Sequence, residues 1–379
     1  MALMQVGDGN ASYALDVFRV AGGRDHLLSF HALPGPVAAT GLNLQPQATG
    51  SYDGPDIPFA TSKRGPRMGY SWLDHVERDS APPPAFVLDY RGMPPYWNLT
   101  EQDNLHVRYH CFTRYSDVAL ADGYPPKGGG SGQPKVLRYL LAHSAGGDNL
   151  HTTNVALIEP YKGQPLIAKA RRLPIENQPP GLEAVALEVV LADGATDYLL
   201  SGPDDDTVFE VEGGLRFSGR LAALRVREGR VERAWLCRAA RVGWDGFEMA
   251  LPAATYRGTV ARMDRELKTH ACLWTTTPLP TDGTLVGSEI IVANDRKLNA
   301  CYTIAGVERD GDLYKVDCGE VCFVRGFVDD RDYSKGYTYN FEEGAEWAIP
   351  QHARLSRQPS GALQVSMTGP LEVAWPDSR

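Results

Sequence analysis

The stretch DVFRVAGGRDHLLSFHA, residues 16–32, decides the fold class, because its residues alternate as β-strands do on both sides of a Gly-Gly pair. The same stretch holds two acids, two arginines and two histidines. It is therefore either a strand pair in a β-sandwich or a charged site, and the rest of the sequence is needed to choose between them.

Short strand-like segments continue this pattern along the chain. Gly (39) and Pro (27) separate segments rich in Val, Leu, Tyr and Thr, such as LHVRYHCF, TTNVALIE and SEIIVAND. Asp-Gly at 193–194 and Glu-Gly at 228–229 are turn signals between such segments. Only residues 66–80 and 340–348 could hold a short helix, and neither has sustained helical periodicity. The spacing is typical of antiparallel sandwiches and predicts an all-β protein.

The chain is long enough for a core that needs no disulfide, and its six cysteines are expected to be buried free thiols. The segment TTTPLPTDGT, residues 275–284, interrupts the strands with two prolines and a glycine. We therefore expect a large antiparallel β-super-sandwich over residues 1–278 and a smaller C-terminal β-domain over residues 279–379.

Composition limits the partners. The net charge is −9 and the sequence has no run of basic residues, so nucleic acid is not expected as a partner. No apolar stretch approaches the roughly 18–20 residues of a membrane span, and the first residues do not resemble an export signal. Residues 124–135 predict a flexible loop rather than a nucleotide site, and residues 203–206, PDDD, a solvated turn rather than a calcium site.

Strand geometry separates the histidines. His26 and His31 are five residues apart, so a regular strand would point them to opposite faces. His106, Arg108 and His110 share one face of a strand, although roughly 13 Å between the two histidines excludes a shared metal. This face is either a row of donors for an extended anionic ligand or an ordinary solvent-facing strand side.

The segment DYRGMPPYWNL offers Tyr90, Arg91, Tyr96 and Trp97 as a surface that could stack on a sugar ring, or as packing residues. A Gly-Gly turn lies between His143 and His151, which are expected in a loop. No G-x-S-x-G or H-E-x-x-H motif is present, and a catalytic pair of carboxylates stays open because sequence does not show which acids converge.

The run from Tyr13 to Phe59, YALDVFRVAGGRDHLLSFHALPGPVAATGLNLQPQATGSYDGPDIPF, resembles the start of the β-sandwich part of the heparinase II/III-like family. Two further segments resemble the same family, LAHSAGGDNLHTTNVALIEPYKGQP at 141–165 and VRGFVDDRDYSKGYTYNFEEGAEWAIP at 324–350. The motif positions that carry over are Asp16, Arg19, Gly22, Gly23, His26 and His31.

The resemblance implies a polysaccharide lyase in which an (α/α) toroid precedes the β-super-sandwich. Such enzymes cleave acidic polysaccharides by β-elimination, with Tyr and His as base and acid. They are often secreted or periplasmic, but the localisation of this chain stays open. The toroid and the family's zinc-binding motif are absent from the sequence, so we expect no metal or other cofactor.

Two functions follow as expectations. In the first, the chain is the β-sandwich half of a lyase that acts on an acidic polysaccharide, and it needs a toroid partner chain or an oligomer. In the second, it is a non-catalytic carbohydrate-binding or structural β-protein. The expected catalytic residues are His31 and His26. The expected substrate-binding residues are Arg19, His106, Arg108, His110, Tyr90, Arg91 and Trp97. For the 16–32 stretch itself, we expect Gly22-Gly23 to close a hairpin.

Overall fold

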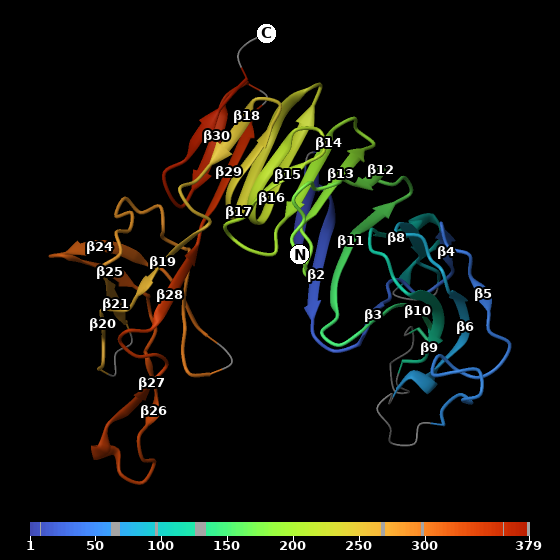
Figure 1. Ribbon diagram of the computed structural model, residues 1–379, viewed down its shortest axis with the longest axis horizontal. Helices are drawn as coiled ribbons and strands as arrows, with labels where there is room; N and C mark the ends of the chain where they lie inside the picture. The colour runs from blue at the N-terminus through green and yellow to red at the C-terminus, as the bar shows by residue number, and fades with distance from the viewer. Residues whose placement is uncertain are drawn as a thin grey trace. The chain divides into compact units, whose positions relative to one another are not determined.

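A computed structural model describes residues 1–7, 9–61, 69–94, 98–125, 134–266, 270–296, 299–358 and 360–376. Antiparallel strands dominate this part of the chain, which confirms the all-β prediction (Figure 1). The short 3-10 turns are η1 (Tyr70–Trp72), η3 (Glu101–Asp103) and η4 (Tyr333–Lys335). Among the described residues, no helix has the length and apolar character to cross a membrane.

The chain divides into two compact units, residues 1–172 with 179–196, and residues 173–178 with 197–379. Strands on both sides of residue 278, where the sequence placed a boundary, pair with each other in the second unit. For example, Thr275 lies opposite Tyr314. The two segments considered for helix also contribute strands, β6 (Leu73–Asp79) and β28 (Glu346–Pro350).

The first unit contains two antiparallel sheets. One has the order β1-β2-β11-β8-β7-β4, the other β3-β10-β9-β6-β5, and β12 pairs with β13 beside them. The strands other than β6 are β1 (Ala2–Val6), β2 (Ala11–Ala21), β3 (Asp25–Phe30), β4 (Val37–Thr40), β5 (Gln45–Pro46), β7 (Phe86–Arg91), β8 (Leu105–Cys111), β9 (Asp117–Gly123), β10 (Leu137–Ala145), β11 (His151–Lys162), β12 (Ile167–Arg172) and β13 (Val185–Leu191).

A hydrophobic core joins the facing sides of these two sheets. Leu88 and Tyr109 from the first sheet pack in one cluster with Leu120 and Leu140 from the second. In β7, buried and half-buried residues alternate along the whole strand, as the period of two requires. Burial of each such side chain stabilises the fold by roughly 1.5–3 kcal/mol, so the alternation that sequence analysis detected is what holds this sandwich together.

The expected hairpin at Gly22-Gly23 does not form. β2 pairs with β11 and β3 pairs with β10, so the chain passes from one sheet to the other at this point, and the β10–β11 segment bends beside it (Figure 1). Across the bend, Gly22 N donates to Leu150 O at 2.8 Å and Leu150 N donates to Gly23 O at 2.9 Å. Both glycines have positive φ, +100° and +76°, which allows the turn without the strain a side chain would add. We call this bend the sheet corner.

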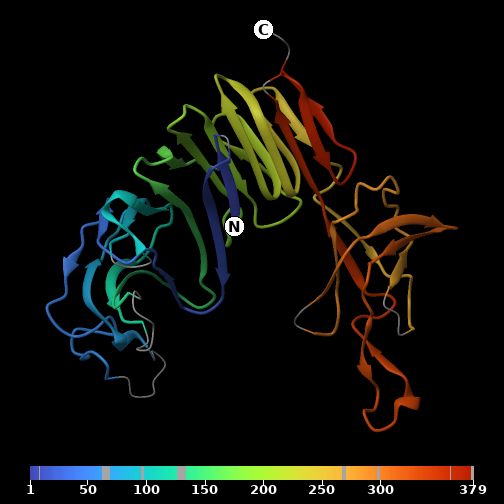
Figure 2. The ribbon, with the colours of Figure 1, turned by 180° about the vertical axis from the view of Figure 1, so that it is seen from behind.

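The second unit contains a large sheet with the order β14-β16-β17-β18-β31, which β15, β29 and β30 extend (Figures 1 and 2). Its strands are β14 (Thr196–Ser201), β15 (Val208–Val211), β16 (Leu215–Arg227), β17 (Arg230–Trp244), β18 (Phe247–Ala250), β29 (His352–Arg357), β30 (Leu363–Met367) and β31 (Glu372–Ala374). A bulge interrupts the β16–β17 pairing at Gly219, whose φ is +107°. A Cβ there would lie 2.2 Å from Ala239 Cα, so only glycine fits.

Between β18 and β29, smaller sheets have the orders β19-β28-β22-β23, β20-β21-β25-β24 and β26-β27. A single core cluster, which includes Leu273, Ile290 and Trp347, joins the first two of these sheets. Their strands other than β28 are β19 (Thr255–Thr259), β20 (Arg262–Met263), β21 (Cys272–Thr275), β22 (Glu289–Val292), β23 (Ala300–Thr303), β24 (Gly306–Asp310), β25 (Leu313–Asp317), β26 (Val324–Phe327) and β27 (Tyr337–Tyr339). All six cysteines are free thiols, as predicted, but only Cys111, Cys272 and Cys318 are buried. Cys322 is half-buried, and Cys237 and Cys301 are exposed.

Candidate functional site

The two expected catalytic histidines lie in different surroundings. His26 Nδ1 is 2.7 Å from Thr152 Oγ1, and its Nε2 is 2.6 Å from Gly22 O. A neutral ring satisfies both contacts if Nε2 donates to the carbonyl and the threonine hydroxyl donates to Nδ1. His26 therefore fastens the sheet corner. His31 follows the end of β3, is exposed, and packs its ring 4.7 Å from that of Tyr139.

His106, Arg108 and His110 do share one strand face, since the intervening Tyr109 is in the core. Acidic side chains on the neighbouring strands supply the hydrogen-bond partners of these three residues. Asp89 on β7 accepts from His106 Nδ1 at 2.8 Å and from Arg108 at 2.9 Å. On the other side, buried Glu159 on β11 lies 2.8 Å from His110 Nε2.

Tyr161 completes this network. Its hydroxyl donates to Asp89 at 2.5 Å and lies 3.0 Å from Arg108, and its ring stacks on that of His106. Burial and the neighbouring Asp89 carboxylate raise the pKa of Tyr161, so its hydroxyl stays protonated near neutral pH and cannot accept a proton. Burial alone would raise the pKa of Asp89, but the hydrogen bonds from its three donors lower it. Because the strongest donors already have acceptors, the interpretation as a row of free donors for a ligand is not supported.

The other expected substrate-binding residues are also dispersed. Tyr90 is fully buried in the first unit's core, so its ring is a packing residue rather than a sugar platform. Arg91 pairs with Glu101 at 3.1 Å. Arg19 Nε donates to the backbone carbonyl of Glu183 at 3.0 Å. Trp97 and Tyr96 lie outside the described residues.

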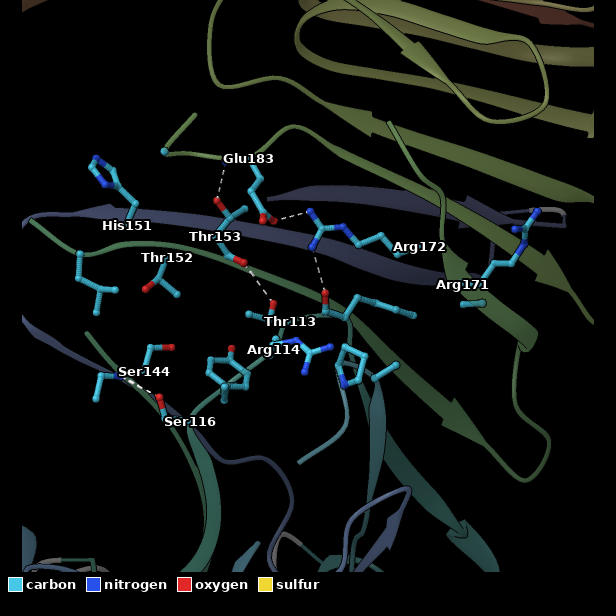
Figure 3. Close-up of a pocket in the computed structure, with 18 residues that line it drawn as sticks. Thr113, Arg114, Ser116, Ser144, His151, Thr152, Thr153, Arg171, Arg172 and Glu183 are labelled. Atoms are coloured by element: carbon cyan, nitrogen blue, oxygen red, sulfur yellow. Dashed lines mark hydrogen bonds and ion pairs between the residues drawn. The ribbon is translucent and has the colours of Figure 1, made fainter. Parts of the chain in front are cut away.

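A pocket of about 730 Å³ opens beside the sheet corner (Figure 3). Residues 112–116, which follow β8, line it together with the end of β10, the start of β11, the end of β12 and residues 181 and 183. We call it the corner pocket. Its basic and acidic side chains are Arg114, Arg171, Arg172, His151 and Glu183.

On one side of the corner pocket the polar side chains hydrogen-bond to one another, and on the other side Arg114 and His151 do not. Arg172 donates to Glu183 at 2.6 Å, and the Glu183 backbone N–H donates to Thr153 Oγ1 at 3.1 Å, which ties β11 and β12 to the 181–183 segment (Figure 3). Arg114 and His151 are exposed, and within the described parts of the chain no hydrogen bond or ion pair engages either.

A buried hydroxyl also lines the corner pocket. Ser144 is 9% exposed, and its Oγ has no hydrogen-bond partner among the described residues. Thr152 Oγ1 lines the same wall, next to His26. Unengaged cationic groups beside hydroxyls suit a ligand that carries both negative charge and hydroxyl groups.

His143 is not a loop residue, contrary to the sequence prediction. It lies within β10, with Nδ1 2.8 Å from Asp117 and Nε2 3.1 Å from Asp25. Burial by itself would lower the pKa of His143, but the hydrogen bonds to these two carboxylates raise it. The other residue of that prediction, His151, begins β11.

One group in the described part of the chain has metal-ligating residue types in reach of one ion. The ligand atoms of Asp74, His75 and Asp122 lie within 4.8 Å of one another. Arg138 already donates to Asp122 at 3.0 Å and Tyr124 donates to Asp74 at 2.7 Å. These bonds neutralise or occupy the carboxylates, so we assign the group no metal.

The predicted solvated turn at residues 203–206 is only half correct. Asp204 caps the turn by accepting from the backbone N–H groups of Asp206 and Thr207. Asp205 instead is buried and accepts from the guanidinium groups of Arg238 and Arg257. A sequence pattern could not find these partners because they lie 33 and 52 residues away.

Comparison with models of protein families, with curated proteins and with solved structures finds no match to this chain. The resemblance to heparinase II/III-like lyases therefore stays a prediction. Sequence reasoning did not select Arg114, Arg172 or Glu183, because neither composition nor spacing brings residues 112–116 and 170–183 together. His151 was noted only as a histidine beside a Gly-Gly turn.

Proposed function

We propose that the chain binds an acidic, uronate-containing polysaccharide in the corner pocket. The observation that carries the proposal is the presence of Arg114 and His151, exposed and unengaged within the described residues, in one pocket with the buried unpaired hydroxyl of Ser144. A guanidinium pairs with a carboxylate or sulfate through two parallel hydrogen bonds, and hydroxyls serve the sugar's own hydroxyl groups.

Local charge supports an anionic ligand in spite of the net charge of −9. Arg171 and Arg172 also line the pocket, but Glu188 pairs with Arg171 and Glu183 with Arg172, each at 2.6 Å. Arg114 and His151 are therefore the basic groups of the pocket that lack an acid partner within the described residues. Because the whole chain repels a polyanion at long range, attraction must come from these few groups at short range. Binding should therefore weaken steeply with added salt, which screens exposed charges.

Calorimetric titration of the full chain with oligogalacturonate and with a neutral glucan oligosaccharide tests the proposal. We expect only the acidic ligand to bind, and Arg114→Gln to weaken binding by about tenfold through loss of one charge-assisted contact. Arg91→Gln is the matched control, because Arg91 already pairs with Glu101 outside the pocket. Equal affinity for both ligands, or equal loss in both variants, would contradict the proposal.

A second candidate function is the β-sandwich half of a polysaccharide lyase, and His151 is the observation that favours it. An unengaged imidazole in the same pocket as unengaged Arg114 could take the C5 proton of a uronate whose carboxylate the arginine neutralises. The departing oxygen needs a proton from a further group, which the resemblance assigns to a helical toroid.

Ultraviolet detection of unsaturated uronate separates the two functions. The chain alone should give no product, and a helical toroid domain supplied with it should give product that His151→Ala abolishes while acidic-saccharide binding persists. Product from the chain alone would show that the proton donor lies within this chain. Binding without product under both conditions favours the carbohydrate-binding function.

A further inference from the structure

One face of the sheet formed by β17, β29 and β30 combines an aromatic ring with arginines and small polar groups. Across the three strands, Arg233 lies opposite Ser356 and then Gln364, and in the next row Trp235 lies opposite Arg354 and then Ser366. Residues directly opposite share a face, with Cβ atoms about 4.5–5.5 Å apart. We call these six residues the Trp235 face. It contains no carboxylate.

No acid of the described residues bonds directly to either arginine of this face. Among the described residues, no hydrogen bond or ion pair engages Arg233 or Arg354, although they are diagonal neighbours whose Cβ atoms lie somewhat less than about 7–8 Å apart. Arg225, the neighbour of Arg233 on β16, instead makes two hydrogen bonds of 2.6 Å to Asp197. Burial first, and then the positive charges of Arg225 and Arg354, lower the pKa of Arg233, and the nearby charges of Glu232 and Asp197 only partly oppose this.

A second Arg–Trp pair in the same unit has a carboxylate partner within the chain. Arg262 lies 3.9 Å over the ring of Trp274, and Asp310 accepts both from Arg262 at 3.0 Å and from the indole N–H at 2.7 Å. That pair carries its own anion. The Trp235 face has the same cationic and aromatic groups, but none of its six residues is an acid and no carboxylate of the described residues bonds to its arginines.

We propose that the Trp235 face is a second binding surface for an acidic saccharide, whose ring stacks on Trp235 while its carboxylate or sulfate is held by Arg354 and Arg233. Gln364 and Ser366 supply exposed polar groups for the sugar's hydroxyls. Two arginines suit one or two charges on a sugar, whereas a nucleic acid strand needs a longer basic track. The argument uses the second unit alone and does not depend on the corner pocket.

Cys237 is a reporter built into this face. It follows Trp235 by two residues on β17, lies opposite His352, and is exposed. Cys301 is an exposed thiol elsewhere in the same unit and serves as an internal control. The experiment measures alkylation rates of both thiols in the full chain by peptide mass spectrometry. The probes are a chondroitin sulfate tetrasaccharide, a neutral glucan tetrasaccharide and an oligothymidylate.

At acidic ligand about ten times above its Kd, the alkylation rate of Cys237 should fall by about tenfold while that of Cys301 stays constant. Arg233→Gln with Arg354→Gln should abolish this protection without lowering the unfolding midpoint, since both guanidiniums lack partners. Arg262→Gln is the matched control and should leave protection intact. Arg114→Gln should also leave it intact, which separates this site from the corner pocket.

Several results would overturn the proposal. Absence of Cys237 protection at saturating acidic saccharide is one, and equal protection in the Arg233→Gln, Arg354→Gln double variant is another. Protection by the neutral glucan would show that charge has no part in binding. Stronger protection by the oligothymidylate than by the saccharide would make the face a nucleic-acid surface instead.

Discussion

The buried carboxylate of Asp205 should contribute more to stability than any exposed ion pair of the second unit. It is 4% exposed and accepts from Arg238 at 2.9 Å, Arg220 at 3.1 Å, Arg257 at 2.6 Å and Thr255 at 3.0 Å. Asp205→Asn keeps the shape and removes the charge, so it leaves three guanidinium groups facing a neutral amide.

The magnitude follows from these contacts. A hydrogen bond to a charged group contributes about 1.5–3 kcal/mol and a neutral one about 1 kcal/mol, so each of the four contacts loses roughly 0.5–2 kcal/mol. The three arginine side chains are 36–58% exposed and regain hydration when the charge is removed, which reduces the total. We expect Asp205→Asn to lower the free energy of unfolding by about 2–4 kcal/mol.

The effect should also depend on pH in a defined direction. Burial alone would raise the pKa of Asp205, but bonds from Arg238, Thr255 and Arg220 lower it. A lowered pKa contributes stability above the ordinary value of about 3.9, and that stability is lost as the pH falls through the lowered value. The difference between wild type and Asp205→Asn should thus be constant from about pH 5 to 8 and shrink only below about pH 4.

Urea unfolding followed by tryptophan fluorescence measures this difference. Five of the seven tryptophans lie in the second unit, so the signal reports mainly on it. They are Trp235, Trp244, Trp274, Trp347 and Trp375. Asp206→Asn is the matched control, since its side chain is exposed next to Asp205. A loss below about 0.5 kcal/mol in Asp205→Asn, or an equal loss in both variants, would refute the reasoning.

Three further variants test other parts of the fold. Because His143 has a raised pKa, the stability lost in His143→Gln should be largest at and below about pH 6 and should vanish as the pH rises through the raised value, in urea titrations at several pH values. Glu159→Gln should cost about 2–4 kcal/mol in the same assay, since the buried carboxylate accepts from His110 and two backbone N–H groups; a neutral result would mean that the network is not coupled to folding. Gly219→Ala should lower the thermal midpoint much more than Gly22→Ala, because both glycines have positive φ but only the Cβ at Gly219 would clash with backbone; similar shifts would show that backbone strain alone matters.

Part of the candidate site was predictable from local sequence. The period of two placed His106, Arg108 and His110 on one side of a strand, with Tyr109 in the core on the other side. Their partners, Asp89 on β7 and Glu159 on β11, belong to other strands, and the register of those strands depends on packing of the whole sheet. The sequence therefore predicted the polar row correctly, but it could not show that the row is satisfied internally.

The sequence by itself determined that the chain is all-β, where most strands lie and which side chains alternate, because these depend on the backbone period and on turn residues a few positions apart. Only the tertiary structure decided that the chain changes sheets at Gly22-Gly23, and that Arg114 and His151 share a pocket. It also decided that Trp235 lies beside Arg354. These are pairings between residues tens to more than a hundred positions apart, and their register is set by packing of the whole sheet rather than by any local pattern.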